Sequence, residues 1–213
     1  DQMAAEGIRF LDAHSPSTIC SPSRYGLYSG QQIYRSTGRG GGAFEGPGGP
    51  SYLKPGTLTL GDMLKQKGYH TGVFGKWHVG LTWFDKEGKR LGGGFDNSLL
   101  IDYDRSTPLI DGPNARGFDV SFVTPNCPTT DPLYIYIENG MVPFPADRRH
   151  LRSTLPNPGG KWRWDNDEGW MAPGYDFLEA DLMFYEKTEE FIVDHLQNNP
   201  VKPFFTVFST QIA

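Results

Sequence analysis

The sequence is poor in cysteine, in long apolar runs and in excess positive charge, and each shortage excludes a class of protein. Only two of its 213 residues are cysteines, which excludes a framework of several disulfides, although a single disulfide stays conceivable. No apolar run approaches the roughly 20 residues that a membrane-spanning helix needs. The net charge is −5, with acidic and basic residues mixed along the chain, so a surface for nucleic acid is not expected.

Glycine, proline and aromatic residues are plentiful instead. The 27 glycines and 17 prolines predict many turns and long loops, while a hydrophobic content of 37% is enough for a real core. The length fits one domain, or one and a half. The sequence opens with "DQMAAEGIRF", which has no initiator methionine, and it ends just after a strand-like run. We therefore expect a piece of a longer protein, cut at both ends.

Two helix-to-strand units predict an α/β fold. In the first, Thr59 caps a helix that Gly68 ends, and a short buried strand follows over residues 69–74. In the second, a helix over residues 176–199 is followed by a buried strand over residues 202–209. The apolar stripe of the second helix consists of Leu178, Leu182, Tyr185, Ile192 and Leu196.

The sequence also predicts a helix end, a short strand, a hairpin turn and a glycine-rich loop. Residues 1–7 end a helix and residues 8–15 form a short strand. Asn139-Gly140 favours the turn of a hairpin. Residues 36–50 form a glycine-rich loop, and a phosphate-cradling function is disfavoured because no Gly-Lys-Ser/Thr closes it.

The stretch "TICSPSRYGLYSG" places a cysteine at the start of a predicted helix. Ser21 suits the N-cap and Pro22 the first helical position, so the helix begins directly after Cys20. A helix N-terminus favours negative charge, which lowers the pKa of a thiol and raises its nucleophilicity. Arg24 lies one turn further on, on the same face. This combination suits an oxyanion such as sulfate or phosphate; the alternative is a buried, inert cysteine.

The same stretch resembles the signature of the sulfatase family. That signature has Cys or Ser, then Pro and Arg at the second and fourth positions after it, and later a small residue followed by Gly. The family often has Thr where this chain has Ser29, which is a mild departure. The positions that fit are Cys20, Pro22, Arg24, Ser29 and Gly30.

A second sulfatase motif, Gly-Lys-Trp-His-x-Gly, is intact at residues 75–80. It lies just beyond the carboxyl end of the strand over residues 69–74, which is where α/β sheets bind their ligands. The first 15 residues and the closing "KPFFTVFSTQIA" also resemble sulfatase segments, while residues 81–175 match least. The two motifs together, in order, are stronger support than either alone.

The resemblance implies a modified residue. In sulfatases the signature cysteine is oxidised after translation to formylglycine, an aldehyde, by a formylglycine-generating enzyme that reads Cys-x-Pro-x-Arg. One hydroxyl of the hydrated aldehyde attacks sulfur and displaces the alcohol, and the second hydroxyl then expels sulfate. The implied function is hydrolysis of a sulfate monoester through a formylglycine made from Cys20.

The resemblance also assigns roles to other residues. Arg24 would hold the diol, and Lys76 would neutralise a sulfate oxygen. His78 would hydrogen-bond the diol or the sulfate and take part in proton transfer. Lys76 and His78 are thus expected to be catalytic and to bind substrate, whereas Trp77 is expected to pack in the core.

A divalent metal, most often calcium, is a further implication of the family. Of its ligands only Cys20, as formylglycine, falls in this chain, because the others are expected before Asp1 and after Ala213. The fragment alone should therefore bind metal poorly and be inactive.

The fold implied is an alkaline-phosphatase-like α/β/α sandwich with a mixed central sheet. Residues 1–213 would be part of that catalytic domain, with residues 81–175 as a loop-rich insertion. Family members are often exported to the periplasm, the exterior or the lysosome, and the compartment here is expected only by that resemblance.

Two alternative functions stay open. One is a phosphonate monoester or phosphodiester hydrolase of the same superfamily. The other is a non-catalytic relative that binds sulfated glycans. Sulfated glycan fragments, steroid sulfates and aryl sulfates are all open as substrates.

Other candidate sites are weaker. Asp102, Asp104 and Arg105 could belong to a calcium loop, but the glycine and final Glu of an EF-hand are missing, which favours a solvated or substrate-facing loop. Residues 161–170, "KWRWDNDEGW", could stack a sugar or aryl ring or form an ordinary loop. Asp119 is expected to order a turn, and Cys127 to be inert. Structural roles are expected for His14, His70, His150 and His195.

Overall fold

A computed structural model describes residues 2–36, 49, 51–91, 103–125, 127, 133–151 and 168–211. Its helices are α1 (Gln2–Glu6), α2 (Cys20–Ser29), α3 (Leu60–Gln66) and α4 (Ala180–Asn198), with short 3-10 turns at Ile33–Arg35 and Pro113–Arg116. Its strands are β1 (His70–Lys76), β2 (Val120–Thr124), β3 (Leu133–Tyr134), β4 (Ile137–Glu138), β5 (Arg148–His150), β6 (Gly169–Met171) and β7 (Phe204–Ser209). No helix among these residues is both long and apolar enough to cross a bilayer.

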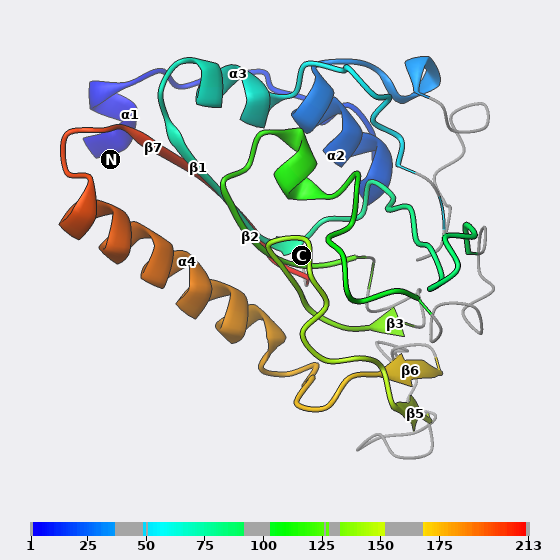
Figure 1. The fold of residues 1–213 in the computed structure, drawn as a ribbon. Coiled ribbons are helices and arrows are strands. Elements are labelled where there is room, and N and C mark those ends of the chain that lie inside the picture. The colour runs from blue at the N-terminus through cyan, green and yellow to red at the C-terminus, as the bar shows by residue number, and fades with distance from the viewer. Residues whose placement is uncertain are drawn as a thin grey trace, which may run out of the picture.

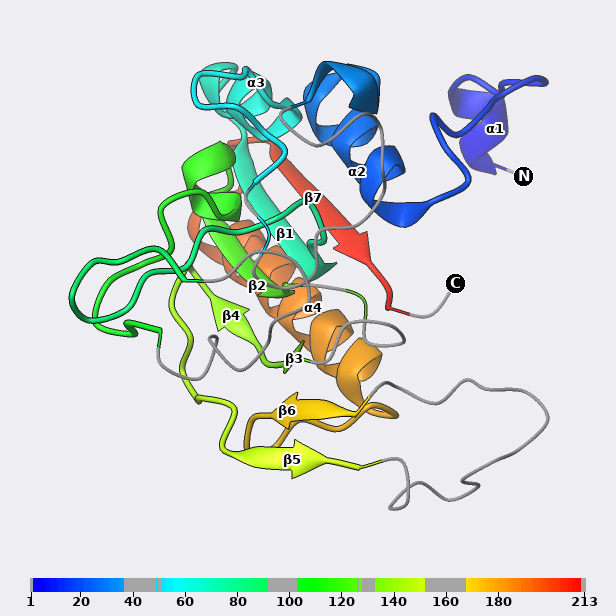
Figure 2. The same cartoon turned by 90° about the vertical axis from the view of Figure 1, so that its right-hand side faces the viewer.

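The main sheet has four strands in the order β4-β2-β1-β7. Strand β1 pairs in parallel with β2 and β7, while β4 runs antiparallel to β2, so the sheet is mixed as predicted. A second, three-stranded sheet has the order β3-β6-β5. Figures 1 and 2 show the small sheet beyond the carboxyl ends of the main strands. Strand β2 lies within residues 81–175, so part of that loop-rich region belongs to the main sheet.

Helices cover both faces of the main sheet, with α4 on one side and α2 and α3 on the other (Figure 1). Neighbouring residues of β1 point to opposite faces, as in any strand. Val73 joins the cluster that includes Tyr28 and Trp77, whereas Phe74 joins the cluster that includes Phe184 and Phe191. Two hydrophobic cores therefore hold β1 in a fixed position.

Both predicted helix-to-strand units are confirmed. Thr59 caps α3 through a reciprocal capping box, in which its hydroxyl accepts from the Asp62 N–H and the Asp62 carboxylate accepts from the Thr59 N–H. Gly68, with a φ of 84°, follows the end of α3. Helix α4 leads into β7, which pairs with β1 in parallel.

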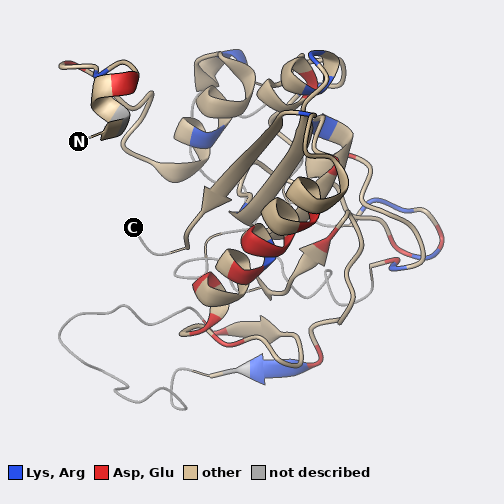
Figure 3. Ribbon diagram, turned by 90° about the vertical axis from the view of Figure 1, so that its left-hand side faces the viewer, with Lys and Arg blue, Asp and Glu red and all other residues tan. Residues whose placement is uncertain are grey.

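The predicted apolar stripe of α4 is wrong. Leu178, Leu182, Tyr185 and Leu196 are half or more exposed. The face against the sheet is formed instead by Ala180, Phe184, Thr188, Phe191 and His195. Two apolar stripes compete on this helix, and the one with two phenylalanine rings faces the sheet because it buries more apolar surface. Figure 3 shows acidic residues along the outward side of α4 and basic residues on β5.

Three other expectations need correction. Residues 8–15 form no strand, because no backbone in the described part of the chain pairs with them, and Ile8, Phe10 and Leu11 are 75–85% exposed. Strand β7 lies at the edge of the sheet as described and is only partly buried. The turn at Asn139-Gly140 is present, with φ values of 49° and 81°, and Glu138 and Met141 pair across it in antiparallel fashion. The predicted hairpin therefore exists but is shorter than expected, and β4 also pairs with β2.

Several predictions concern segments outside the described residues. These are most of the glycine-rich loop at 36–50, Asp102, and the aromatic stretch at 161–167.

Candidate active site

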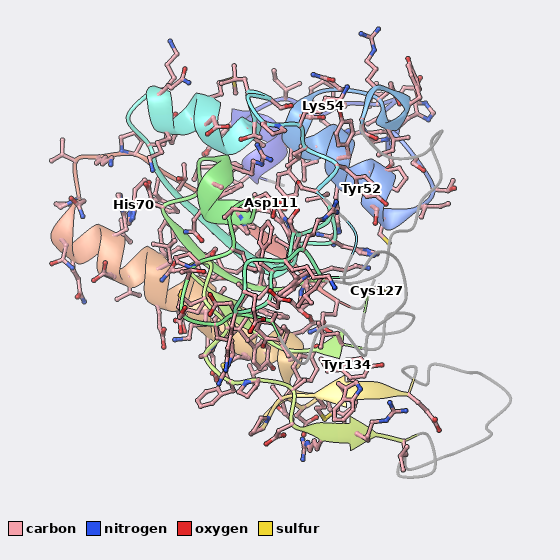
Figure 4. The ribbon with its side chains drawn as sticks, turned by 45° about the vertical axis from the view of Figure 1, so that its right-hand side comes forward. Tyr52, Lys54, His70, Asp111, Cys127 and Tyr134 are labelled. Carbon is pink, nitrogen blue, oxygen red and sulfur yellow. The ribbon has the colours of Figure 1, made fainter. Side chains whose placement is uncertain are left out.

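Three segments that are distant in the sequence meet at the carboxyl end of β1. They are the first turn of α2, residues 76–78 at the end of β1, and Thr124, Pro125 and Cys127 at and just after the end of β2. The Trp77 N–H donates to the Thr124 carbonyl at 3.0 Å, and the His78 N–H donates to the Pro125 carbonyl at 3.1 Å. Figure 4 shows Cys127 and His70 on opposite sides of the molecule, as expected because β1 runs from His70 toward this site.

Helix α2 begins one residue earlier than predicted. Ile19 is the extended residue that precedes the helix, and Cys20 is its first residue, so Ser21 is not the N-cap. The side chain of Ile19 cannot cap the helix, and Ser17 holds the first turn instead. Its hydroxyl accepts from the Ile19 N–H, and its carbonyl accepts from the Ser23 hydroxyl. These contacts fix the entry into the helix and hence the position of Cys20.

Cys20 lies beside His78. The Cys20 Sγ atom is 3.2 Å from the His78 Nδ1 atom, and the cysteine is half-buried while His78 is 3% exposed. The contact joins the two motifs found in the sequence, which are otherwise separated by a loop, a helix and a strand. A sulfur or oxygen atom at position 20 can therefore exchange a proton with this imidazole.

The predicted low pKa of Cys20 is wrong. A hydrogen bond with the Cys127 thiol, and then burial, hold the pKa of Cys20 well above its ordinary value, and the nearby Lys76 ammonium only partly opposes them. The unmodified thiol is therefore neutral near pH 7 and a poor nucleophile.

Lys76 brings a buried positive charge to the site. It is the last residue of β1 and is 4% exposed, and its ammonium group acts on the Cys20 thiol both as a charge and as a hydrogen-bond partner. The Arg24 guanidinium donates to the Lys76 carbonyl and so ties α2 to the end of β1. The same guanidinium acts on the buried Tyr28 hydroxyl, whose pKa burial raises to about 12. Lys76 thus places a cation beside position 20, while Arg24 fixes the backbone next to it.

The backbone around Lys76 is unusual. His78 has a φ of 51°, in the left-handed region that a residue with a side chain seldom occupies. Trp77 lies between Lys76 and His78 in the chain. It is fully buried and packs on Tyr28, with ring centroids 4.8 Å apart, which confirms its packing role. At Gly75, with a φ of 101°, an added Cβ would lie 1.9 Å from the Ser209 carbonyl oxygen. Only glycine fits this approach of β1 to β7.

Cys127 is a site residue that the sequence did not reveal. It is buried, and it is the main cause that raises the pKa of the Cys20 thiol. The available signal was its place shortly after β2, because the carboxyl ends of parallel neighbours meet at one edge of a sheet.

The other candidates lie elsewhere and have structural contacts. The Asp119 carboxylate accepts from the Thr71 N–H and pairs with Lys65 at 2.6 Å, so its contacts are structural, but they join it to β1 and α3 rather than order a turn. The Asp104 carboxylate accepts from the Ser106 N–H and hydroxyl, as in an exposed turn.

The histidines outside the site also have partners. His70 and His195 hydrogen-bond through their Nδ1 atoms at 2.9 Å, and His14 contacts Asp12 at the surface. The side chain of His150 is outside the described part. Of the aromatic stretch at 161–170, Trp170 stacks under the Arg149 guanidinium at 5.4 Å.

A metal ion does not fit the residues in hand. Within the described part of the chain, no three His, Cys, Asp or Glu side chains gather so that they could hold one. Calcium also prefers oxygen ligands, and the side chains nearest to position 20 supply nitrogen and sulfur.

The chain is similar to known proteins in sequence. The family model described as Sulfatase matches residues 1–211. The chain is 29% identical to an N-acetylgalactosamine-6-O-sulfatase of Bacteroides thetaiotaomicron, over 99% of this chain and 42% of that protein. It is 35% identical to arylsulfatase G of Mus musculus, over 63% of this chain and 24% of that protein.

A solved structure extends the likeness to the fold. It is described as part of the metabolism of multiple glycosaminoglycans by Bacteroides thetaiotaomicron, and it matches with a TM-score of 0.67 and 25% identity, over 100% of this chain and 45% of that one. The fold is therefore the alkaline-phosphatase-like fold of sulfatases. The chain spans less than half the length of these relatives.

Proposed function

Because the chain belongs to the sulfatase family, we propose that the protein containing it hydrolyses sulfate monoesters through a formylglycine formed at Cys20. The observation that carries this proposal is the convergence of Cys20, Lys76 and His78 at the carboxyl end of β1. These three residues come from the two motifs that sulfatases share. The arrangement gives position 20 a base at 3.2 Å and a buried cation.

The residues around position 20 fit a hydrated aldehyde better than a thiol. The unmodified thiol is neutral, because its pKa is raised by the Cys127 hydrogen bond and by burial. A formylglycine would supply a hydroxyl nucleophile and an internal route for expelling sulfate. The neighbouring nitrogen atoms of Lys76 and His78 are suited to hydrogen-bond its oxygen atoms.

His78, Lys76 and Arg24 each have a role in this proposal. His78 accepts or returns a proton at Nδ1, the atom that faces position 20. Lys76 places its charge beside the oxygen atoms on which negative charge develops, in a buried setting where that charge is poorly screened. Arg24 fixes the helix start against β1 and, through its own charge, favours an anionic group at position 20.

Calcium is part of the proposal only because sulfatases generally use a divalent metal. Its ligands other than position 20 are proposed to lie in the rest of the protein, so the isolated 213 residues should be inactive and bind calcium weakly. Calorimetric titration of the folded fragment with calcium chloride checks this. Tight binding with one ion per chain would contradict it.

The test of the proposal joins mass spectrometry to kinetics. The complete protein is made in a host with an active formylglycine-generating enzyme, and tryptic peptide 10–24 is weighed to detect an aldehyde at Cys20. The values of kcat/KM are then compared for an aryl sulfate, N-acetylgalactosamine 6-sulfate, an aryl phosphate diester and an aryl phosphonate. A preference for sulfate esters supports the proposal.

The remaining outcomes select the alternatives. A preference for the phosphate diester or the phosphonate selects the related hydrolase. An aldehyde at position 20 without any turnover selects a glycan-binding relative. A cysteine left unmodified under these conditions removes the formylglycine mechanism.

A further inference from the structure

A cleft lies between three loop segments outside the proposed active site. Residues 85–91, 103–106 and 142–147 line it, and its volume is about 1090 Å³. None of these residues belongs to the candidate active site. Pockets that hold drug-sized ligands have volumes of about 300–1,000 Å³. This cleft therefore has room for a ligand of more than one ring.

Backbone contacts join two of the three segments. The Asp104 N–H donates to the Phe84 carbonyl at 2.7 Å, and Asp85 and Tyr103 form an antiparallel bridge. The Asp85 carboxylate accepts from the Lys89 N–H at 2.7 Å, which closes the turn between these two residues. The walls of the cleft are thus held by main-chain hydrogen bonds and do not depend on side chains alone.

Tyr103 gives the cleft a polar group without a partner. It lines the cleft and is 3% exposed, and its ring packs against Trp83 with centroids 4.9 Å apart. Its hydroxyl is buried and makes no hydrogen bond with any residue that the structure describes. Burial raises the pKa of Tyr103, so the hydroxyl stays protonated and can donate. Because an unpartnered buried hydroxyl costs free energy, a ligand that reaches it from the cleft would gain a hydrogen bond.

The rim of the cleft carries charges of both signs. Lys86, Lys89 and Arg105 are exposed cations, and Glu87 and Asp147 are exposed carboxylates. A ligand with charge of one sign would meet like charge here. A metal ion is not indicated either, because no acidic cluster in the described ranges could hold one. Ligand hydroxyls suit this rim, since each can donate to a carboxylate and accept from a cation.

Apolar side chains form another part of the lining. Leu91, Val142 and Ala146 are buried there, and Pro143 and Pro145 lie beside them. Binding pockets commonly combine such apolar lining with a few polar groups that fix the orientation of the ligand. A sugar ring matches both parts, because its faces carry C–H groups and its edge carries hydroxyls.

We propose that this cleft binds an uncharged segment of a glycan, two or more sugar rings long, with a sugar hydroxyl bonded to Tyr103. The C–H faces of the rings lie against residues 142–146, and the other hydroxyls bond to the charged rim. This second site goes beyond the proposed hydrolysis and does not depend on it. Two of its residues, Asp104 and Arg105, come from the segment for which the sequence predicts a solvated or substrate-facing loop.

The test is a ligand-observed NMR titration of the complete protein with three neutral tetrasaccharides: chitotetraose, maltotetraose and agarotetraose. We expect at least one of them to bind. Its Kd should change by less than about twofold between about 50 and about 500 mM sodium chloride, because an uncharged ligand is not screened.

Matched tyrosine variants assign the binding to the cleft. Tyr103→Phe removes the hydroxyl and keeps the ring on Trp83, so the Kd should rise by about three- to tenfold, as for one lost hydrogen bond. Urea unfolding should show no loss of stability, because the hydroxyl makes no hydrogen bond within the described residues. Tyr136→Phe, whose ring stacks on Phe122 outside the cleft, should bind as the wild type.

Three results would overturn the inference. They are failure of all three tetrasaccharides to bind, wild-type affinity in Tyr103→Phe, and a Kd that rises steeply with salt. The readouts are independent of hydrolysis. A protein that binds the neutral sugar but cleaves no sulfate ester keeps this inference and loses the proposed function, and the reverse outcome separates them equally.

Discussion

The Sγ atom of Cys20 lies 3.2 Å from the Nδ1 atom of His78, although 58 positions separate the two residues in the chain. The contact depends on the first turn of α2 and on the end of β1, and each is fixed by its own hydrogen bonds. A substitution that shifts either element should therefore change the distance between position 20 and His78. The following predictions all concern the complete protein.

Replacing His78 should reduce turnover with little loss of structure. His78→Asn removes the titrating ring but keeps a residue that tolerates a φ of 51°. We expect kcat toward a sulfate ester to fall by about 10²- to 10⁴-fold, the usual contribution of an acid or base. The pH–rate profile should also lose one ionisation. His14→Asn, at a site 82% exposed, is the control, and an equal loss there would contradict the assignment.

Replacing Lys76 should reduce activity without reducing stability. Lys76→Met keeps the length of the side chain but removes a charge from a residue that is 4% exposed. We expect kcat to fall by about 10²- to 10³-fold, because one stabilising group is lost. The free energy of unfolding should stay the same or rise, because a buried charge no longer has to be desolvated. Parallel kinetics and urea unfolding check this, with the exposed Lys67→Met as control.

Gly75 should be intolerant of any side chain. In Gly75→Ala the new Cβ would lie 1.9 Å from the Ser209 carbonyl oxygen, and the backbone has a φ of 101°. We expect a loss of roughly 3 kcal/mol or more in the free energy of unfolding, in the upper range for single substitutions.

Gly174→Ala separates the two causes at Gly75. Gly174 has a φ of 77° but no atom within 4 Å of a built Cβ. Its loss should be about 1–2 kcal/mol, which is the cost of a left-handed backbone alone. Equal losses at the two positions would show that the contact with β7 is unimportant.

The His70–His195 pair should make stability depend on pH. Burial lowers the pKa of His70 below its ordinary value of 6.5, and His195 and Lys202 act in the same direction, against the opposing charges of Asp119 and Asp194. The unfolded chain therefore takes up its proton first as the pH falls. The stability is full above pH 6.5 and declines as the pH drops from there to the lower pKa of the folded state.

Urea unfolding at pH 8 and at pH 5.5 measures this effect. The wild-type protein should lose more stability between the two pH values than His70→Gln, in which the titrating group is gone. The exposed His14→Gln should behave as the wild type. An unchanged pH dependence in His70→Gln would show that other groups control it.

The sequence predicted much of the site because the relevant signals are local. The capping residue Thr59, the buried strand before the Gly-Lys-Trp-His motif and the helix next to Cys20 each depend on a few neighbouring residues, although both boundaries were predicted a residue or two away from their observed places. Their meeting follows from the rule that ligands bind at the carboxyl ends of parallel strands. The family motifs then identified the chemistry.

What the sequence did not predict depends on contacts between distant residues. The pKa of Cys20 was expected to fall because a helix N-terminus is visible in the sequence, whereas the Cys127 thiol that raises it is not. The buried face of α4 was likewise mispredicted, because Leu182 and Phe184 both belong to plausible stripes and only the sheet selects between them.

The hydrogen bonds from Trp77 and His78 to residues 124 and 125 have a consequence for binding. They fix the backbone of the proposed site in register with β2. The buried Trp77 ring further restricts this backbone by packing in the core. The conformational entropy of placing Lys76 and His78 is therefore lost when the sheet folds and not when a ligand arrives. We expect the proposed site to bind sulfate oxygens with little rearrangement of the Lys76 and His78 backbone, so that differences between substrates arise outside these residues.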